Sequence, residues 1–196
     1  MKVQIIVGAT RQGRVSDRLA PWIIKQAKET LPSAEFEVVD MVDYPLPFFD
    51  EAISPQYNPD RQPTPEVAKF LSKIAEGDAY IVVTPEYNRT YPAVLKNAFD
   101  TLDFQMKQKP VALVAHGSTG GAQSVAHFRS LIPAVQAIST PHAVYFAAQP
   151  GTAIDDEGNL APELAANPYG PQTALQQLLA DLNWYAEALS AARTNA

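Results

Sequence analysis

The chain contains five short apolar segments with the pattern of buried β-strands. Each is rich in valine, isoleucine or aromatic residues and is bounded by glycine, proline or polar clusters, which is typical of strands. The five predicted strands are residues 2–8, 35–41, 79–85, 110–115 and 143–148. We therefore expect a five-stranded sheet at the centre of the fold.

Apolar residues between and after these strands recur with the 3.6-residue period of amphipathic helices. The apolar positions of the five predicted helices are Leu19, Ile23, Ile24 and Ala27; Val67, Phe70, Leu71 and Ile74; Val94, Leu95, Ala98, Phe99 and Leu102; Val125, Phe128, Ile132 and Val135; and Leu175, Leu178, Leu179, Leu182, Ala186 and Leu189. Strict alternation of strand and helix predicts a doubly wound α/β fold, a parallel sheet with helices on both faces.

Ligands of such open sheets bind beyond the carboxyl ends of the strands. The loops 8–17, 84–92 and 115–121 follow the first, third and fourth predicted strands. A functional site is therefore expected where these three loops meet.

Two segments are irregular. Residues 45–65 hold six of the 17 prolines, too many for a helix interior or a central strand, so we expect a rigid, extended surface loop there. Residues 149–171 carry turn residues around "DDEGN". Loops this long are usually lids, interface arms or disordered segments. No repeat or interdomain linker is evident, so a single domain, 1–196, is expected.

Composition and charge narrow the class of protein. No apolar run reaches the ~20 residues of a membrane helix, and the start of the chain lacks a signal-peptide pattern, so we expect a soluble cytoplasmic protein without membrane contact. The absence of cysteine excludes disulfides, thiolate metal sites and thiol nucleophiles. The net charge of −6 argues against a nucleic-acid binder. The first 28 residues are nonetheless basic, which indicates either a local anion site or a solvated helix face.

The first loop, "GATRQGRVS" (8–16), has the parts of a phosphate site. Thr10 and Ser16 offer hydroxyls, Arg11 and Arg14 offer charge, and a helix start would add backbone N–H groups. It lacks the middle glycine of a dinucleotide fingerprint and the Gly-Lys-Ser/Thr of a P-loop, so one phosphate is expected rather than a pyrophosphate. Asp40 is interpreted as a strand-end turn residue rather than a ribose-binding acid.

The second loop, "TPEYNRTYP" (84–92), follows the third predicted strand. Thr90 is expected to cap the next helix, and Pro92 to lie in its first turn. A stiff turn would explain the prolines but not the "EYN" between them. A carboxylate, a flat ring and an amide at this edge suit a planar heterocycle that needs hydrogen bonds along its rim and packing on its face.

The third loop, "HGSTGGAQS" (116–124), contains three glycines that would let backbone approach a ligand. Ser118 half-matches a nucleophile elbow, because His116 stands where the first glycine belongs, and this counts against a hydrolase. The three histidines, His116, His127 and His142, have no metal-ligand spacing, so no metal site is expected, and each is interpreted as structural.

Together the first loop, "TPEYN" with the following "YPAVLKNAFD", and the "GG" loop resemble the NADPH-dependent FMN reductase family over roughly residues 1–140. The resemblance implies a flavodoxin-like fold with strand order 2-1-3-4-5. It also implies FMN as cofactor and NAD(P)H as co-substrate. The FMN phosphate would be bound by Thr10, Arg11, Val15 and Ser16. The isoalloxazine would be lined by Pro85, Glu86, Tyr87 and Asn88, and its pyrimidine edge by Ser118, Gly120 and Gly121.

In this family NAD(P)H reduces FMN by hydride transfer and leaves before a small acceptor binds, so the resemblance implies ping-pong turnover. The acceptor would be a quinone, free flavin, azo compound or metal oxyanion. No catalytic side chain is expected, and Glu86 is expected to place the ring rather than transfer a proton. A homodimer or homotetramer is implied. One departure is Arg18, where many members have asparagine. The alternatives are a flavodoxin-type electron carrier, which needs a partner reductase, and a nonenzymatic binding module.

Overall fold

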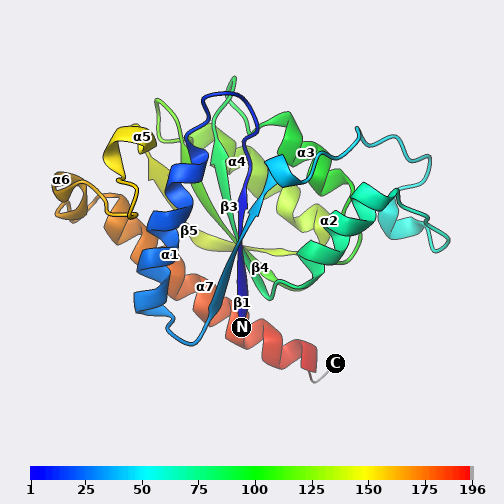
Figure 1. The fold of residues 1–196 in the computed structure, drawn as a ribbon. Helices are drawn as coiled ribbons and strands as arrows, with labels where there is room; N and C mark the ends of the chain where they lie inside the picture. The colour runs from blue at the N-terminus through cyan, green and yellow to red at the C-terminus, as the bar shows by residue number, and fades with distance from the viewer. Residues whose placement is uncertain (195–196) are drawn as a thin grey trace.

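The computed structural model describes residues 1–194, which fold around one parallel sheet (Figure 1). The five strands stand in the order β2-β1-β3-β4-β5, which confirms the expected topology. The strands are β1 (Lys2–Val7), β2 (Glu35–Asp40), β3 (Ala79–Pro85), β4 (Pro110–His116) and β5 (Ile138–Phe146). Residues 195–196 of the predicted domain lie outside the described part of the chain.

Helices cover both faces of the sheet, as expected. Val3, Ile5 and Val7 alternate along β1 toward the face packed by α1 (Leu19–Thr30) and α7 (Pro171–Thr194). The intervening Ile6 joins the core on the other face. That core includes residues of α2 (Pro65–Ala75), α3 (Ala93–Asp100) and α4 (Ala122–Leu131). The central strands β3 and β4 are buried at every position, because helices cover them on both sides.

The fifth strand begins at Ile138, five residues before the predicted start at 143. Its burial is irregular because β5 is an edge strand, and the ladder to β4 shifts register between Val111 and Leu113. The apolar pattern that predicts a buried strand is therefore missing from its first half. At the other end, β5 stops at Phe146 rather than at 148.

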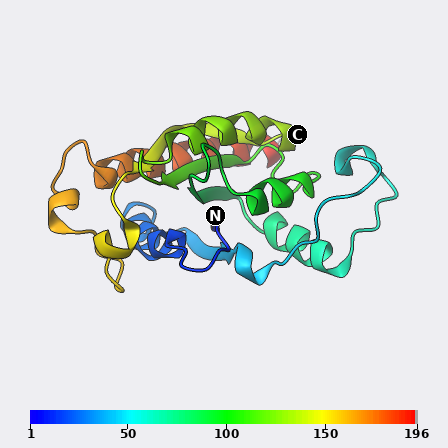
Figure 2. The ribbon, with the colours of Figure 1, turned by 90° about the horizontal axis from the view of Figure 1, so that it is seen from above.

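The two irregular segments contain short elements of their own. Residues 45–65 include the 3-10 turn η3 (Pro55–Tyr57) and reach the first residue of α2, where Thr64 is the N-cap. Residues 149–171 contain α5 (Pro150–Ala153) and α6 (Pro162–Ala165), with an antiparallel bridge between Ile154 and Leu160. The two segments lie at opposite ends of the molecule (Figures 1 and 2).

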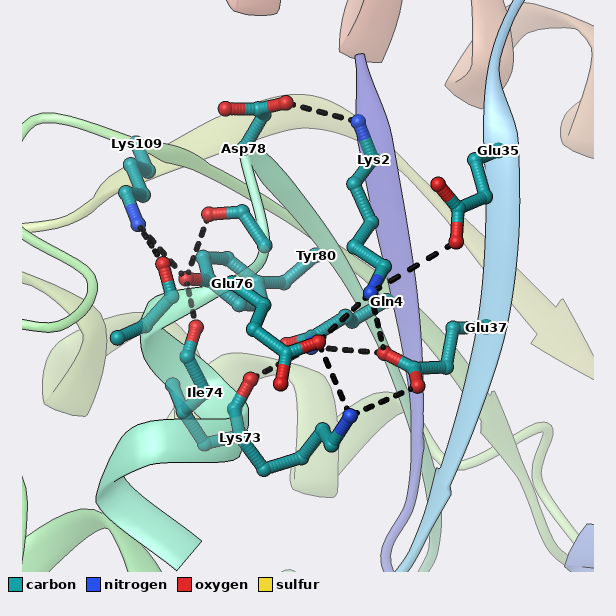
Figure 3. A network of polar contacts seen from close by, with 12 residues as sticks. Lys2, Gln4, Glu35, Glu37, Lys73, Ile74, Glu76, Asp78, Tyr80 and Lys109 are labelled. Carbon is teal, nitrogen blue, oxygen red and sulfur yellow. Dashed lines mark hydrogen bonds and ion pairs between the residues drawn. The ribbon is translucent and has the colours of Figure 1, made fainter.

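A polar network closes the sheet at the amino ends of its strands (Figure 3). Lys2 Nζ lies 2.7 Å from Glu76 Oε2 and 3.3 Å from Glu37 Oε2, and Lys73 Nζ bonds to both of these carboxylates. The hydrogen bond to Glu76, and secondarily the one to Glu37, raises the pKa of Lys2. The network joins β1 and β2 to the end of α2, far from the carboxyl ends where the three loops lie. Within residues 1–194, no helix is long and apolar enough to cross a membrane.

Candidate functional site

The loops after β1, β3 and β4 come together at the carboxyl edge of the sheet, at the top of Figure 1. The topology requires this, because β3 pairs with both β1 and β4. Backbone hydrogen bonds extend the pairing past the strands: Gly8 donates to the carbonyl of Val83 at 2.8 Å, and Glu86 donates to the carbonyl of His116 at 2.9 Å. The expected meeting of the three loops is confirmed.

The first loop is held by Arg14. Its guanidinium makes a bidentate ion pair with Asp40, with both N–O distances at 2.5 Å, and also donates to the carbonyl of Ala9 at 2.8 Å. The hydrogen bonds to Asp40, and secondarily its negative charge, raise the pKa of Arg14. Asp40 also accepts from the Val42 N–H, which confirms it as a turn residue. The expectation of two available cations is therefore wrong for Arg14, because its charge is neutralised within the fold.

Arg11 differs from Arg14 in its surroundings. Its side chain is exposed, and its guanidinium carbon lies 4.9 Å from the centre of the Tyr87 ring. No carboxylate within residues 1–194 forms an ion pair with it. A cation stacked on an aromatic ring is held in place while its N–H groups stay available to an anion. The structure thus brings one expected phosphate ligand next to one expected ring contact.

Ser16 is fully buried at the end of the first loop, where the turn η1 (Ser16–Arg18) leads into α1. Its Oγ lies 2.7 Å from Nε2 of His116, the last residue of β4. Burial, and secondarily the charge of Arg11, lowers the pKa of His116 to about 4, so the ring is neutral at physiological pH. Thr10 is exposed beside Arg11 in sequence, and Val15 is half-buried.

The second loop is a tight hairpin. Tyr87 N–H donates to the Thr90 carbonyl at 2.8 Å and Thr90 N–H donates back at 3.1 Å, while Asn88 and Arg89 have φ of 50° and 72°. Two left-handed residues between such bonds form a type I′ turn. The expected helix cap at Thr90 is wrong, because Thr90 closes this hairpin. Pro92 is also not in the first turn of α3; it is the extended residue that precedes the helix.

The carboxylate of Glu86 turns toward α4 and accepts from the Gln123 N–H at 3.0 Å. It therefore satisfies a free donor at the amino end of that helix. Pro85 is buried at the end of β3, and its carbonyl accepts from the Ser124 hydroxyl at 3.1 Å. Asn88 is exposed at the tip of the hairpin. Of the "EYN" residues, Tyr87 and Asn88 line a pocket beside the hairpin, and Glu86 is bonded to the start of α4.

The third loop depends on its glycines. Gly120 and Gly121 have φ of 73° and 79°, and a Cβ on Gly121 would lie 2.6 Å from the Ala115 Cβ. Only glycine fits there, so the backbone is brought close against β4. Ser118 is exposed at the loop tip. The hydrolase alternative loses support, because the imidazole nearest in sequence to Ser118 is hydrogen-bonded to Ser16.

A pocket of about 610 Å³ opens beside the hairpin. Its walls are the hairpin, α3 from Ala93 to Asp100, and residues 48–49, with aromatic side chains from Phe48, Phe49, Tyr87 and Tyr91. The sequence analysis does not assign Phe48, Phe49 and Tyr91 to the site. The aromatic pair in "PLPFFD" was the available signal, because aromatic residues are unexpected in an exposed proline-rich loop.

Residues 45–64, the irregular segment up to the start of α2 (the 45–64 segment), are held by two sets of polar contacts, one to Asn97 of α3 and one centred on Arg61. Asn97 of α3 donates to the Pro47 carbonyl and accepts from the Phe49 N–H, both at 2.8 Å. Arg61, whose side chain is 6% exposed, pairs with Glu51 at 2.6 Å and with Asp103 at 3.3 Å. The segment is largely extended on the surface, as expected, and these side-chain contacts hold it in addition to its prolines.

Comparison with known proteins identifies the family. The chain is an open α/β protein of the flavodoxin-like kind, with an exposed cation, an aromatic hairpin and a glycine loop at the edge where such sheets bind ligands. Residues 1–151 match the NADPH-dependent FMN reductase family. The chain therefore belongs to this family of flavin-dependent oxidoreductases.

Individual relatives agree with that assignment. An NAD(P)H-dependent FMN reductase of Schizosaccharomyces pombe is 34% identical over 128 residues, covering 65% of this chain and 64% of that protein. A 2-hydroxy-1,4-benzoquinone reductase of a Burkholderia species is 30% identical over 171 residues, covering 83% and 87%. The chain thus spans just under two thirds of the first of these relatives. The solved structure of FerB, a flavoenzyme NAD(P)H:(acceptor) oxidoreductase from Paracoccus denitrificans, has a TM-score of 0.72 at 23% identity, covering 95% and 97%, which shows the shared fold.

Within the described residues there is no group of three or more histidine, aspartate or glutamate side chains that could hold a metal ion.

Proposed function

We propose that the chain is an FMN-dependent NAD(P)H oxidoreductase that reduces a small acceptor in ping-pong order. The observation that carries this proposal is the stacking of Arg11 on Tyr87, 4.9 Å apart. It sets an available cation beside an aromatic ring at the ligand-binding edge of the sheet, which suits a ligand with one phosphate and one flat ring system. When bound, FMN supplies the capacity to accept and donate a hydride.

The donor chemistry of the first loop fits a phosphate monoester. Arg11 and Thr10 are exposed and offer charged N–H groups and a hydroxyl. The Ser16 side chain is fully buried and its hydroxyl pairs with His116, so Ser16 would reach a phosphate only after the loop rearranges. Val15 is half-buried next to Ser16 and would contribute its backbone and an apolar contact. The exclusion of Arg14 from this set leaves one cation for the phosphate dianion. A single strong ion pair is enough to favour FMN over riboflavin, which lacks the phosphate.

The other two loops would hold the ring. Pro85 and Glu86 contribute the strand end and its backbone, and Tyr87 and Asn88 the hairpin wall. Ser118, Gly120 and Gly121 would meet the pyrimidine edge with a hydroxyl and close backbone groups. Glu86 is engaged with the Gln123 N–H and His116 with Ser16, so neither is available as a proton donor. The protein binds and orients, and no catalytic side chain is assigned.

The acceptor would enter through the pocket next to Tyr87. Its volume of about 610 Å³ and its aromatic walls suit a flat compound such as a quinone, an azo dye or a free flavin. A metal oxyanion is also small enough, but Lys96 in the wall is paired with Asp100 at 2.5 Å, so the wall offers no free positive charge from that lysine. The quinone reductase and FMN reductase names of the relatives favour organic acceptors.

Self-association as a homodimer or homotetramer belongs to the same proposal. Phe48, Ile53 and Tyr57 are large and exposed on the 45–64 segment, with Phe48 83% exposed. A partner subunit would bury this apolar surface. Sedimentation or light scattering on the purified protein measures the assembly.

The decisive experiment is spectroscopic. The purified protein mixed with FMN should bind it, and NADPH added without oxygen should bleach the flavin absorbance within one turnover. A flavodoxin-type carrier would bind FMN but leave NADPH unoxidised until a reductase is added. Initial rates at several NADPH and quinone concentrations should give parallel reciprocal plots. Intersecting plots would contradict ping-pong order, and failure to bind FMN would contradict the proposal as a whole.

A further inference from the structure

Asn97 of α3 lies in the wall of the pocket beside the hairpin and also holds another part of that wall. Its side-chain Nδ2 donates to the Pro47 carbonyl and its Oδ1 accepts from the Phe49 N–H, both at 2.8 Å. The two bonds lie on either side of Phe48, so one amide fixes three consecutive residues. Phe48 and Phe49 are the residues that the 45–64 segment contributes to the pocket wall.

A second cavity, of about 350 Å³, also borders residues 47–49. Its other walls come from the later part of the 45–64 segment, the start of α2 and Thr101, so it is distinct from the pocket beside the hairpin. Phe48 and Phe49 line both cavities. A strip of chain between two cavities has few packed neighbours, and packing therefore holds it weakly. The hydrogen bonds from Asn97 take over that task.

The position of Asn97 in the fold makes it a firm support. An amide offers both a donor and an acceptor, which matches a carbonyl and an N–H two residues apart. The neighbouring Ala98 and Phe99 are buried in the core, so the amide stands on a fixed helix. Because α3 begins just after the hairpin, Asn97 relates the strip to Tyr87. A flat ring packs well only if the walls are correctly spaced.

We infer that Asn97 is a positioning residue for the electron acceptor: its amide sets the distance between the Phe48–Phe49 wall and the hairpin wall, and with it the affinity for flat aromatic acceptors. This inference rests on the proposed function, which places the acceptor in this pocket. Asn97 acts through the position of the two phenylalanines and takes no part in hydride transfer. Its replacement should therefore change acceptor binding and leave the FMN site intact.

The test compares two acceptors of the reduced protein. FMN-loaded protein is reduced with NADPH without oxygen and mixed in stopped flow with 1,4-naphthoquinone, a flat ring pair, or with ferricyanide, which accepts electrons without ring packing. In Asn97→Ala the naphthoquinone concentration that gives half the maximal reoxidation rate should rise about three- to tenfold, the scale of one ordinary hydrogen bond. The maximal rate and the rate with ferricyanide should stay near those of the wild type. Asn97→Asp keeps the acceptor for Phe49 but loses the donor for Pro47, so it should weaken naphthoquinone binding too.

Two controls separate this role from a general effect on the fold. Asn183→Ala makes the same change on α7, where the amide donates to Glu187 at 3.1 Å, and should alter neither acceptor. In a background with both Phe48→Ala and Phe49→Ala, Asn97→Ala should have no additional effect on naphthoquinone, because the rings that it positions are gone. FMN affinity, measured by quenching of flavin fluorescence, should be the same in every variant, which also shows that each one is folded.

Several results would overturn the inference. An unchanged response to naphthoquinone in Asn97→Ala would show that the wall keeps its position without the amide. Equal losses with naphthoquinone and ferricyanide would show that Asn97 only stabilises the fold. A further loss in the background without the two phenylalanine rings would show that Asn97 acts on something else. A wild-type protein that binds no FMN, or whose FMN is not reduced by NADPH, would instead contradict the proposed function. The two failures are therefore distinguishable.

Discussion

Glu86 and Gln123 are joined by a hydrogen bond of 3.0 Å from a backbone N–H to a carboxylate. The bond connects the hairpin after β3 to the first turn of α4, and it places a negative charge at the positive end of that helix. Glu86, the carboxylate of the second loop, therefore has a structural role.

Replacing Glu86 tests this assignment. Glu86→Gln keeps an acceptor but removes the charge, so the free energy of unfolding should fall by about 0.5–1 kcal/mol in urea titrations. Because Glu86 transfers no proton, kcat and its pH profile should stay near those of the wild type. Gln123→Ala is the matched control, since it leaves the backbone N–H in place. A variant that binds FMN fully but does not turn over would contradict the structural role.

Arg11 should contribute strongly to FMN affinity. Arg11→Ala should weaken FMN binding by about 1.5–3 kcal/mol, the scale of a hydrogen bond to a charged group, in a fluorescence titration. Arg11→Lys keeps a charge but loses the flat stacking on Tyr87, so an intermediate loss is expected.

Replacing Arg14 should affect stability, in contrast to Arg11, whose replacement should affect FMN affinity. Its guanidinium is paired with Asp40, and both side chains are 19% exposed. Arg14→Met should lower stability by about 1–3 kcal/mol, because it leaves a half-buried carboxylate without its partner. If Arg11→Ala left FMN affinity unchanged, the phosphate would have to bind away from the first loop.

The buried His116 predicts a pH dependence of stability. Its pKa falls from 6.5 in the unfolded chain to about 4 in the folded protein, so the unfolded state binds the proton more tightly. The stabilisation is complete above pH 6.5, is lost progressively as the pH falls toward 4, and is constant below that. The loss should reach on the order of 3 kcal/mol.

Urea unfolding between pH 4 and pH 7 measures this loss. The difference in unfolding free energy between the wild type and His116→Gln gives the part of the loss that is due to His116, because both proteins keep the same carboxylates and the same two other histidines. Parallel stability curves for the two proteins would show that the folded ring titrates normally.

Gly121 should tolerate no side chain. Its φ is 79°, and an added Cβ would lie 2.6 Å from the Ala115 Cβ and 2.9 Å from the His116 N. Gly121→Ala should cost about 2–4 kcal/mol through strain and overpacking, seen as a clearly lower Tm. Gly151→Ala is the control, because its Cβ would meet only Val15 at 3.6 Å. Equal melting temperatures for the two variants would contradict the fit of the third loop.

The fold was largely predictable from periodicity, and the exceptions have physical reasons. Strands β1, β3 and β4 are buried almost throughout and have the apolar pattern of a covered parallel sheet, and the edge strand β2 was recognisable from its run of valines and phenylalanine. The start of β5 was missed because Ile138 and its neighbours lie on an edge strand and include a proline. The expected helix cap at Thr90 is wrong because a threonine just before a helix can also close a hairpin. The left-handed backbone of Asn88 and Arg89 makes the hairpin here, and the sequence alone does not show that backbone conformation.

The candidate site was predictable loop by loop but not contact by contact. The meeting of the three loops follows from the position of each motif after a strand, but the sequence does not show which of Arg11 and Arg14 stays unpaired. The pairing of Arg14 with Asp40 and the contact of Ser16 with His116 join residues 26 and 100 positions apart. No local pattern contains such contacts. Phe48 and Phe49 were missed because they enter the pocket from a segment without periodicity.

Of the two sets of polar contacts that hold the 45–64 segment, the one from Asn97 binds the backbone of the segment, whereas the one centred on Arg61 uses side chains. Asn97 binds the Pro47 carbonyl and the Phe49 N–H, so the identities of residues 48 and 49 do not enter into its hydrogen bonds. The aromatic wall of the pocket can therefore be exchanged residue by residue while its frame stays attached. If the acceptor binds in this pocket as proposed, the segment is a suitable place for substrate range to diversify between related enzymes and for a mutant library to change it in the laboratory.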